Sequence, residues 1–219
     1  DLQSNFPSID PGKIQVVYNG VTIMKSEAGH SSAGKVFEFP YLLYVGNVYP
    51  HKNMEGLIDV FNEIHSEKSD LRLVLIGKDD YFYNRIKEYA RGKGLYHENR
   101  LGPIVFLGYV DDSELAHWYK NAIAYVFPSF YEGFGLPPLE AMIHGCPVVS
   151  SDRTCMPEIL GDAAVYFDPS DKEDMKKKII SVIDDNNLRY NLQTKGYQRH
   201  RLYDWNRCIK ETLVIYNLV

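Results

Sequence analysis

The sequence has no long hydrophobic run, few cysteines and no excess of basic residues. A membrane-spanning helix needs about 20 consecutive apolar residues, and no segment approaches that length. The 24 Lys and Arg residues are outnumbered by 29 Asp and Glu residues, and the net charge of -5 argues against nucleic acid as the main partner. The 219 residues suffice for one domain with terminal extensions.

The cysteines Cys146, Cys155 and Cys208 are scattered and show neither CxxC nor metal-type spacing. An odd set of this kind favours free thiols in a reducing compartment, so we expect a cytoplasmic protein. The histidines form no HxxxH pair. Because the sequence begins with Asp and shows no signal-peptide pattern, we expect it to be part of a longer chain.

Short apolar runs alternate with amphipathic stretches after about residue 40, which is typical of a parallel sheet wrapped by helices. Runs such as LRLVLIG and NAIAYVF are continuously apolar, as burial on both faces of a sheet requires. Strands are expected at 41–46, 71–77, 104–107, 123–127, 147–150 and 164–167. Helices are expected at 53–66, 81–93, 112–120, 136–144, 155–160 and 171–184. The predicted fold class is α/β, with a doubly wound, mostly parallel, Rossmann-like sheet over residues 41–200.

The two ends of the chain differ from this pattern. Prolines and glycines in residues 1–40 interrupt one strand-like run, KIQVVYNGV, which predicts a connecting segment followed by a flexible loop. Asn19 and Gly20 within that run are also compatible with a hairpin turn. Apolar residues at helical spacing from Trp205 to Tyr216 predict an amphipathic helix within residues 201–219. Its apolar face either packs within this domain or docks on a missing one.

The segment SFYEGFGLPPLEAMIHG, residues 129–145, combines several agreeing signals. Gly133 and Gly135 allow backbone conformations closed to other residues, and Pro137 and Pro138 fit the first turn of a helix. Gly145 supplies the end of that helix. A glycine loop leading into a helix presents N–H groups and a partial positive charge. The segment therefore predicts a phosphate site.

Two glutamates accompany this loop. We expect Glu140 in the first turn of the helix, where it either complements the helix dipole or accepts hydrogen bonds from the hydroxyls of a ribose. A phosphate would repel Glu132, so this residue is better suited to neutral sugar hydroxyls. The spacing alone leaves the structural and the functional interpretation of both residues open.

The stretch FPSFYEGFGLPPLEAMIHGCPVVSSDRTCMPEILGDAAVYFDPSD resembles the signature region of the family 4 retaining glycosyltransferases, which have the GT-B fold. The resemblance implies that the chain is the C-terminal, donor-binding domain of such an enzyme. Members carry two glutamates separated by seven residues, matched here by Glu132 and Glu140. The first is expected to contact the transferred sugar and the second the ribose. The backbone that faces the sugar and diphosphate would be that of Gly133, Phe134, Gly135 and Leu136.

The segment YLLYVGNVYPHKNMEGLIDVF contributes Lys52, beside Asn53, a candidate helix cap. An ammonium at a helix N-terminus is unfavourable, and a bound diphosphate would resolve the conflict. In the family the matching lysine binds the donor diphosphate and offsets its charge as it departs. Lys52 and Glu132 are therefore the predicted catalytic residues, and Gly46 and Asn47 join the predicted donor site.

Asn47 departs from the family pattern, because many members have an arginine at this position. Asparagine carries no charge. Either Lys52 carries more of the diphosphate alone, or another cation substitutes, for which Arg153 is the candidate.

In the segment VFLGYVDDSELAHWYKNA the resemblance assigns Tyr109 and Val110 to the nucleobase. Asp111 or Asp112 either accepts hydrogen bonds from a guanine edge or caps the helix that starts near Ser113.

The implied reaction is retaining transfer of a hexose from a nucleoside diphosphate sugar, with GDP-mannose ahead of a UDP-hexose, to an unidentified glycan or lipid-linked glycan. No metal or tightly bound cofactor is expected, because Lys52 and the helix N-terminus supply the positive charge. An N-terminal acceptor domain of the same protein would complete the enzyme and could place it at a membrane surface as a peripheral protein. This domain alone should transfer poorly.

Three alternatives remain. A nucleotide-sugar epimerase uses the same fold, although its characteristic motifs are not evident. A noncatalytic nucleotide-sugar-binding module would bind donor without transfer. A receiver-like signalling domain needs an acidic cluster at a strand end, for which Asp79 and Asp80 are the candidates, although a solvated turn explains them better.

Overall fold

The computed structural model describes residues 2–22 and 39–217 of the chain. These residues fall into two compact units, one formed by Asp1–Thr22 and Tyr203–Val219 and the other by Ile23–Leu202. The flexible loop expected before residue 40 falls mainly on residues 23–38, which lie outside the described residues.

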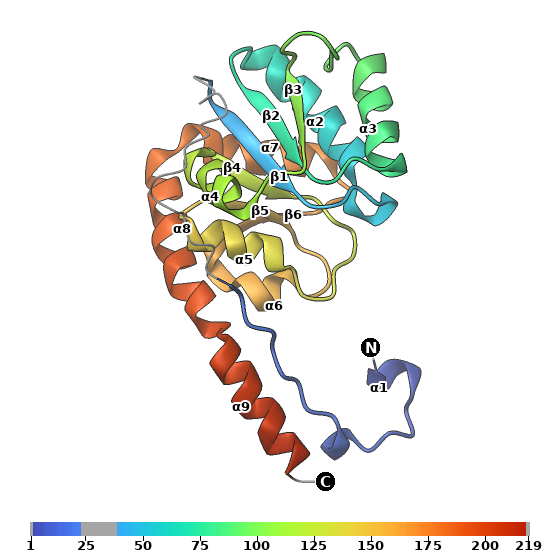
Figure 1. Ribbon diagram of the computed structural model, residues 1–219, viewed down its shortest axis with the longest axis vertical. Helices are drawn as coiled ribbons and strands as arrows, with labels where there is room; N and C mark the ends of the chain where they lie inside the picture. The colour runs from blue at the N-terminus through green and yellow to red at the C-terminus, as the bar shows by residue number, and fades with distance from the viewer. Residues whose placement is uncertain (1, 23–38, 218–219) are drawn as a thin grey trace. The chain divides into compact units, whose positions relative to one another are not determined.

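The larger unit is built on a parallel sheet with the strand order β3-β2-β1-β4-β5-β6 (Figure 1). The order reverses between β1 and β4, because the chain builds one half of the sheet outward from β1 and then returns to build the other half. Such a reversal opens a crevice at the carboxyl ends of the strands, where doubly wound folds bind ligands. The strands are β1 (Tyr41–Val45), β2 (Arg72–Ile76), β3 (Ile104–Gly108), β4 (Ala124–Phe127), β5 (Val148–Ser151) and β6 (Ala164–Phe167).

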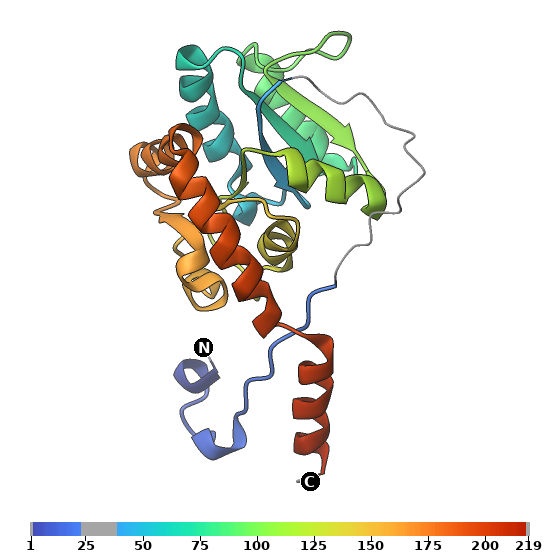
Figure 2. The same cartoon turned by 90° about the vertical axis from the view of Figure 1, so that its left-hand side faces the viewer.

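Helices cover both faces of this sheet (Figures 1 and 2). One face carries α2 (Met54–Glu67), α3 (Tyr81–Gly92) and α7 (Lys172–Asp184), and the other carries α4 (Asp112–Asn121), α5 (Leu136–Ile143) and α6 (Met156–Leu160). The central strands are buried from both sides, and every residue of β4 is buried. The continuously apolar runs of the sequence are thus confirmed as strands of an α/β sheet. The six expected strands and six expected helices are all present, with ends that differ by a residue or two.

Two helices of the described residues were not predicted: the short α1 (Leu2–Asn5) and the longer α8. Helix α8 (Asn186–Arg199) has the polar sequence NNLRYNLQTKGYQR and buries only Leu192 and Gly196, so it shows no apolar stripe. Asp185 begins the helix by accepting hydrogen bonds from the backbone N–H groups of Asn187 and Leu188 at 2.8 and 2.9 Å. Gly196 lets α8 approach α5, since a Cβ at this position would lie 3.1 Å from the side chain of Met142.

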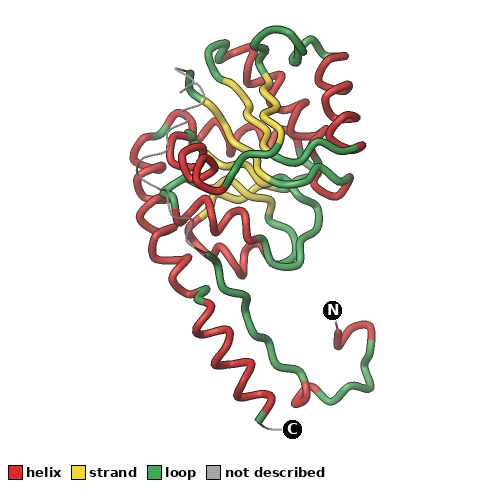
Figure 3. Tube along the Cα trace, in the orientation of Figure 1, coloured by secondary structure: helices red, strands yellow, loops and turns green. Residues whose placement is uncertain are grey.

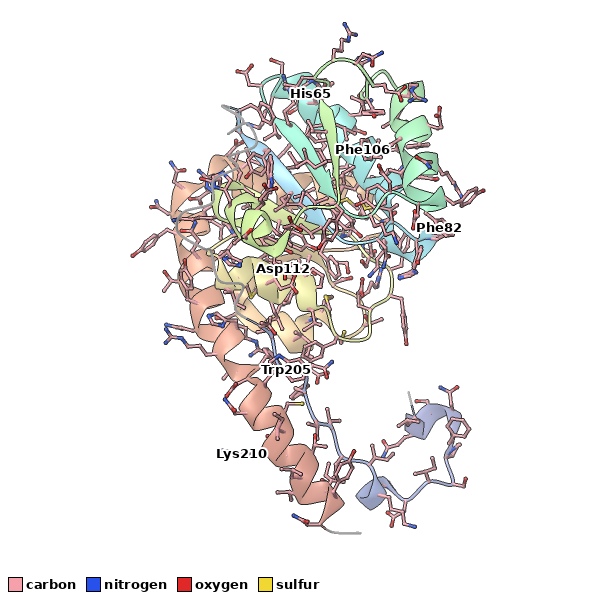
Figure 4. The ribbon with its side chains drawn as sticks, in the orientation of Figure 1. His65, Phe82, Phe106, Asp112, Trp205 and Lys210 are labelled. Carbon is pink, nitrogen blue, oxygen red and sulfur yellow. The ribbon has the colours of Figure 1, made fainter. Side chains whose placement is uncertain are left out.

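The smaller unit contains α1 (Leu2–Asn5), η1 (Pro11–Lys13) and α9 (Trp205–Tyr216), the expected C-terminal helix. The strand-like run at 13–21 forms no strand, so the alternative of a hairpin turn at Asn19 and Gly20 was wrong. The end of the run instead contacts the residues at the start of α9. The N–H of Val21 donates to the carbonyl of Tyr203 at 3.0 Å, and a Cβ on Gly20 would come within 2.5 Å of Trp205, labelled in Figure 4.

Three further observations concern the described residues as a whole. None of their helices is both long and apolar enough to cross a membrane. All three cysteines are free, as their spacing predicted. No group of three or more His, Cys, Asp and Glu side chains in residues 2–22 and 39–217 is arranged to hold a metal ion, and independence from metals stays a prediction.

Candidate functional site

Three loops lie together beyond the carboxyl ends of β1, β4 and β5 (Figure 3). The N–H of Phe130, in the β4 loop, donates to the carbonyl of His51, in the β1 loop, at 2.8 Å. The N–H of Glu132 donates to the hydroxyl of Thr154, in the β5 loop, at 3.2 Å, and the thiol of Cys155 donates to the carbonyl of Glu132 at 3.3 Å. These hydrogen bonds join the loops that carry most of the predicted donor residues.

Lys52 and Glu132, the two predicted catalytic residues, form an ion pair in which Nζ lies 2.6 Å from Oε1. Their side chains are only 14% and 11% exposed. The ammonium also lies 5.5 Å from the centre of the Phe127 ring, within range of a cation–π interaction. The sequence assigned diphosphate as the partner of Lys52 and sugar as the partner of Glu132. In this structure each is the partner of the other, which removes the cost of a buried unpaired charge.

Asn53 does not cap α2 through its side chain, so that prediction was wrong. It adopts a left-handed conformation with φ of 55°, and its side chain makes no capping hydrogen bond. The side-chain amide donates instead to the carbonyl of Pro169 at 3.0 Å. Asn53 thereby ties the start of α2 to the loop between β6 and α7.

The glycine loop leads into α5 as expected, but its two glycines differ in backbone conformation and in the space around them. Gly135 has φ of 89° and directly precedes the helix, and a Cβ there would lie 2.4 Å from the side chain of Met156. Gly133 does not have positive φ, and a Cβ there would meet nothing within 4 Å. Gly135 is therefore required by the fold, whereas Gly133 leaves open space beside the N-terminus of α5, next to the backbone of Phe134 and Leu136.

Glu140 lies in the second turn of α5 rather than the first, because the helix begins at Leu136. The helix-dipole interpretation therefore fails, since the dipole effect is confined to the terminal turn. The hydroxyl of Tyr119, on α4, donates to Oε2 of Glu140 at 3.3 Å. Burial raises the pKa of Glu140, and the hydrogen bond from Tyr119 partly opposes this. Glu140 is thus a half-buried carboxylate held between α4 and α5.

The predicted nucleobase positions follow β3. Tyr109 is 74% exposed and Val110 is half-buried. Asp111 precedes α4 but makes no side-chain capping hydrogen bond, so the predicted capping role was wrong. Asp112, the first residue of α4, is labelled in Figure 4, and both carboxylates lie on exposed residues.

Three other charged candidates have structural partners. Arg153 pairs with Asp168, so it would have to leave that carboxylate to serve a phosphate. Asp80 caps α3 by accepting a hydrogen bond from the N–H of Tyr83 at 2.9 Å. Asp79 pairs with Lys87 at 2.6 Å. Asp79 and Asp80, the acidic pair that a receiver domain would need, therefore have structural roles.

A group of buried tyrosines, which was not predicted, lies beneath the end of β1 and the loop that follows it. Gly46 and Asn47 follow β1, and the carbonyls of Val45, Gly46 and Asn47 each accept a hydrogen bond from a different buried tyrosine. The only available signal was that these strand and helix positions carry tyrosine rather than phenylalanine, since a buried phenol needs a hydrogen-bond partner.

Comparisons with known proteins agree with this geometry. Residues 27–199 match the family described as glycosyl transferases group 1. The chain is 36% identical over 184 residues to the O-antigen chain mannosyltransferase B of Escherichia coli, covering 82% of this chain and 46% of that protein. It is 32% identical over 179 residues to the O-antigen chain mannosyltransferase RfbU of Salmonella typhimurium, covering 80% of this chain and 46% of that protein.

Among solved structures, the C-terminal domain of a glycosyl transferase group 1 family protein (LpcC) from Francisella tularensis superimposes with a TM-score of 0.62 at 26% identity. The match covers 73% of this chain and 85% of that domain. The chain spans about half the length of the two mannosyltransferases. It belongs to the glycosyl transferases group 1 family and has the fold of the C-terminal domain of these GT-B enzymes.

Proposed function

We propose that this domain binds a nucleoside diphosphate hexose and that, within a longer enzyme, it serves the retaining transfer of the hexose to an acceptor glycan. The observation that carries the proposal is the ion pair of Lys52 and Glu132 at the crevice, beside the glycine loop that leads into α5. GDP-mannose is the preferred donor, because two relatives that match the domain are named mannosyltransferases.

In this proposal the donor exchanges the partners of the ion pair. A diphosphate carries more negative charge than a carboxylate, so it takes the ammonium of Lys52 and also faces the N-terminus of α5. Glu132 then turns to the hydroxyls of the hexose, which are neutral donors that a carboxylate accepts well. One binding event thus gives both buried charges new partners.

The same arrangement suits the bond-breaking step. Cleavage at the anomeric carbon leaves an oxocarbenium-like sugar and a departing nucleoside diphosphate. Lys52 and the amides near Gly135 stabilise the charge on the leaving group, which is an electrostatic contribution to the transition state. Glu132 holds the sugar in position. Glu140 anchors the ribose, and Tyr109 and Val110 contact the base.

The apolar residues of α9 support a further partner within the longer enzyme. Ile209 and Leu213 are each 53% exposed and Val214 is 59% exposed in the smaller unit. Exposed apolar residues at helical spacing are typical of a helix that packs on another surface. We assign this face to the acceptor domain.

The test is isothermal titration calorimetry of the folded chain with GDP, UDP and GDP-mannose. We expect binding of GDP and GDP-mannose, and weaker binding of UDP. Absence of heat with all three ligands would contradict the donor site. Tighter binding of UDP than of GDP would retain the site and contradict the choice of base.

A further inference from the structure

Three buried tyrosines converge on three consecutive carbonyl groups, that of the last residue of β1 and those of the first two residues of the loop after it. The hydroxyl of Tyr125 donates to the carbonyl of Val45 at 3.1 Å, and that of Tyr83 donates to the carbonyl of Gly46 at 2.8 Å. The hydroxyl of Tyr44 donates to the carbonyl of Asn47. The three side chains come from β4, α3 and β1, and each is 0% exposed. We call Tyr44, Tyr83 and Tyr125 the tyrosine clamp.

The clamp sets the direction of the loop amides. In a trans peptide the N–H points opposite to the C=O. Because the carbonyl of Gly46 points inward to Tyr83, the N–H of Asn47 points away from the core. The carbonyl of Asn47 points to Tyr44, so the N–H of Val48 points to the opposite side of that peptide, although the Val48 side chain is itself buried. Neither N–H donates to any group within residues 2–22 and 39–217.

Two glycines make room for this arrangement. Gly46 has φ of +139°, a conformation that residues with a Cβ rarely adopt. A Cβ on Gly77 would lie 2.3 Å from both the carbonyl oxygen of Gly46 and the hydroxyl of Tyr83. Gly77 therefore keeps open the space in which these two groups meet. The loop conformation depends on the clamp and on both glycines.

Burial keeps the clamp in its donating form. It raises the pKa of Tyr44, Tyr83 and Tyr125 well above the usual value of a phenol. Each hydroxyl therefore stays protonated throughout the neutral range. Titration in this range therefore does not break the three hydrogen bonds to the carbonyls.

We propose that the tyrosine clamp is a set of positioning residues that hold the N–H groups of Asn47 and Val48 as a phosphate-binding pair. This inference rests on the proposed function and adds new ligands to the same site. The loop runs from these amides through η2 (Pro50–Lys52) to Lys52, so both amides and the ammonium belong to one short segment at the crevice. Successive N–H groups that point the same way form a recognised anion-binding arrangement.

The proposed donors belong to the backbone and do not require an arginine at residue 47. The exposed side chain of Asn47 carries no charge, but its backbone N–H and that of Val48 supply two oriented donors. Oriented backbone dipoles stabilise a phosphate without the conformational entropy of a long side chain. These two donors add to the ammonium of Lys52, while Arg153 pairs with Asp168.

Tyrosine-to-phenylalanine substitutions test the clamp, because they remove only a hydroxyl. Tyr83→Phe and Tyr44→Phe should each weaken GDP binding about three- to tenfold, as expected when one hydrogen bond that orients a ligand group is lost. Tyr41→Phe is the matched control. Tyr41 lies on β1 as well, and its buried hydroxyl donates to the carbonyl of Trp118 at 2.8 Å, away from the loop. It should lower the unfolding temperature similarly and leave GDP affinity unchanged.

Amide NMR of the wild-type chain supplies a measurement that needs no variant. Addition of GDP should shift the N–H resonances of Asn47 and Val48, and the shift should shrink in Tyr83→Phe. If GDP binds in a Lys52-dependent way while both resonances stay unmoved, the clamp proposal is overturned and the donor site stands. Equal GDP affinities in Tyr83→Phe, Tyr44→Phe and Tyr41→Phe would overturn it too. Failure of the wild type to bind GDP would overturn both proposals.

Discussion

Asp59 and Glu132 are acidic residues of the larger unit that occupy contrasting environments. Asp59, on α2, accepts three donors: the ammonium groups of Lys93 and Lys172, each at 2.7 Å, and the hydroxyl of Tyr89 at 2.7 Å. Glu132 has Lys52 as the only side-chain partner of its carboxylate among the described residues. The first arrangement joins α2 to α7 and to the end of α3, and the second lies at the crevice.

The difference distinguishes a carboxylate whose partners stabilise the fold from one that can exchange its partner for a ligand. Both carboxylate oxygens of Asp59 already accept hydrogen bonds from Lys93, Lys172 and Tyr89, so a ligand could offer this residue no better partners. An ammonium has three donors and a carboxylate has about four acceptor sites, so Lys52 and Glu132 each keep unused capacity. The pair also has little solvent to stabilise its charges. A ligand that offers better partners to both can therefore separate it.

The largest effect is expected from Lys52→Met. It should weaken GDP binding at least about 100-fold, because a charge-assisted hydrogen bond is lost and the unpaired Glu132 then repels the diphosphate. Calorimetry measures this directly. Lys93→Met is the control, since it removes one partner of Asp59 and should leave GDP affinity intact. Similar GDP affinities of the wild type and Lys52→Met would show that the ion pair of Lys52 and Glu132, like that of Lys93 and Asp59, has no role in binding.

Glu140→Ala comes next, with an expected loss of about 1–3 kcal/mol in GDP binding, as polar ligand groups lose a partner. A nucleotide that lacks the ribose hydroxyls isolates the cause. Dideoxy-GDP should bind the wild type and Glu140→Ala about equally. If Glu140→Ala binds GDP as the wild type does, Glu140 does not hold the ribose.

Much of this site follows from the sequence, and the rest depends on contacts between distant residues. The apolar runs before Gly46 and Ser129 predicted strands, and parallel strands bring the following loops to one edge. The pairing of Lys52 with Glu132 joins residues 80 apart in the chain and had no local signal. The start of α5 at Leu136 was predicted correctly, but Glu140 is its fifth residue and therefore lies one residue past the first turn to which it was assigned.

Two other failures have similar causes. The run at 13–21 is apolar enough for a strand, but no neighbouring strand among the described residues offers it a ladder. Helix α8 has no apolar stripe, and it packs through a single large apolar side chain, Leu192, and the close approach at Gly196. Periodicity finds elements that bury one continuous face, and these two segments lie outside that rule.

Glu132→Gln is expected to strengthen the binding of GDP and to weaken the contribution of mannose to the binding of GDP-mannose. Loss of the carboxylate frees Lys52, so GDP should bind about threefold to tenfold more tightly, the scale of one released ion pair. The additional affinity that mannose gives GDP-mannose should fall, because glutamine is a weaker acceptor than a carboxylate. Titration of GDP and GDP-mannose into both proteins separates the effects. Weaker binding of GDP by Glu132→Gln would contradict the exchange of partners.

Asp59→Asn is expected to have the smallest effect, and only on stability. Burial alone would raise the pKa of Asp59, but hydrogen bonds from Lys172, Lys93 and Tyr89 outweigh it and lower the pKa to about 2. A carboxylate with a depressed pKa stabilises the fold above its unfolded pKa, and this contribution is lost as the pH falls from about 4 to about 2.

Allowing for solvent screening, Asp59→Asn should lower the free energy of unfolding by about 1 kcal/mol at pH 7. The difference from wild type should vanish near pH 2, as measured by urea denaturation across this range. A difference that stays constant with pH would place the stabilisation elsewhere. GDP affinity should not change.

A crystal structure of the chain with GDP-mannose tests the exchange of partners most directly. The account predicts diphosphate oxygens within hydrogen-bond distance of Lys52 Nζ and the N–H groups of Asn47 and Val48, with Glu132 turned to the mannose hydroxyls and Glu140 to the ribose. A bound nucleotide elsewhere on the domain, with the ion pair of Lys52 and Glu132 intact, would contradict it.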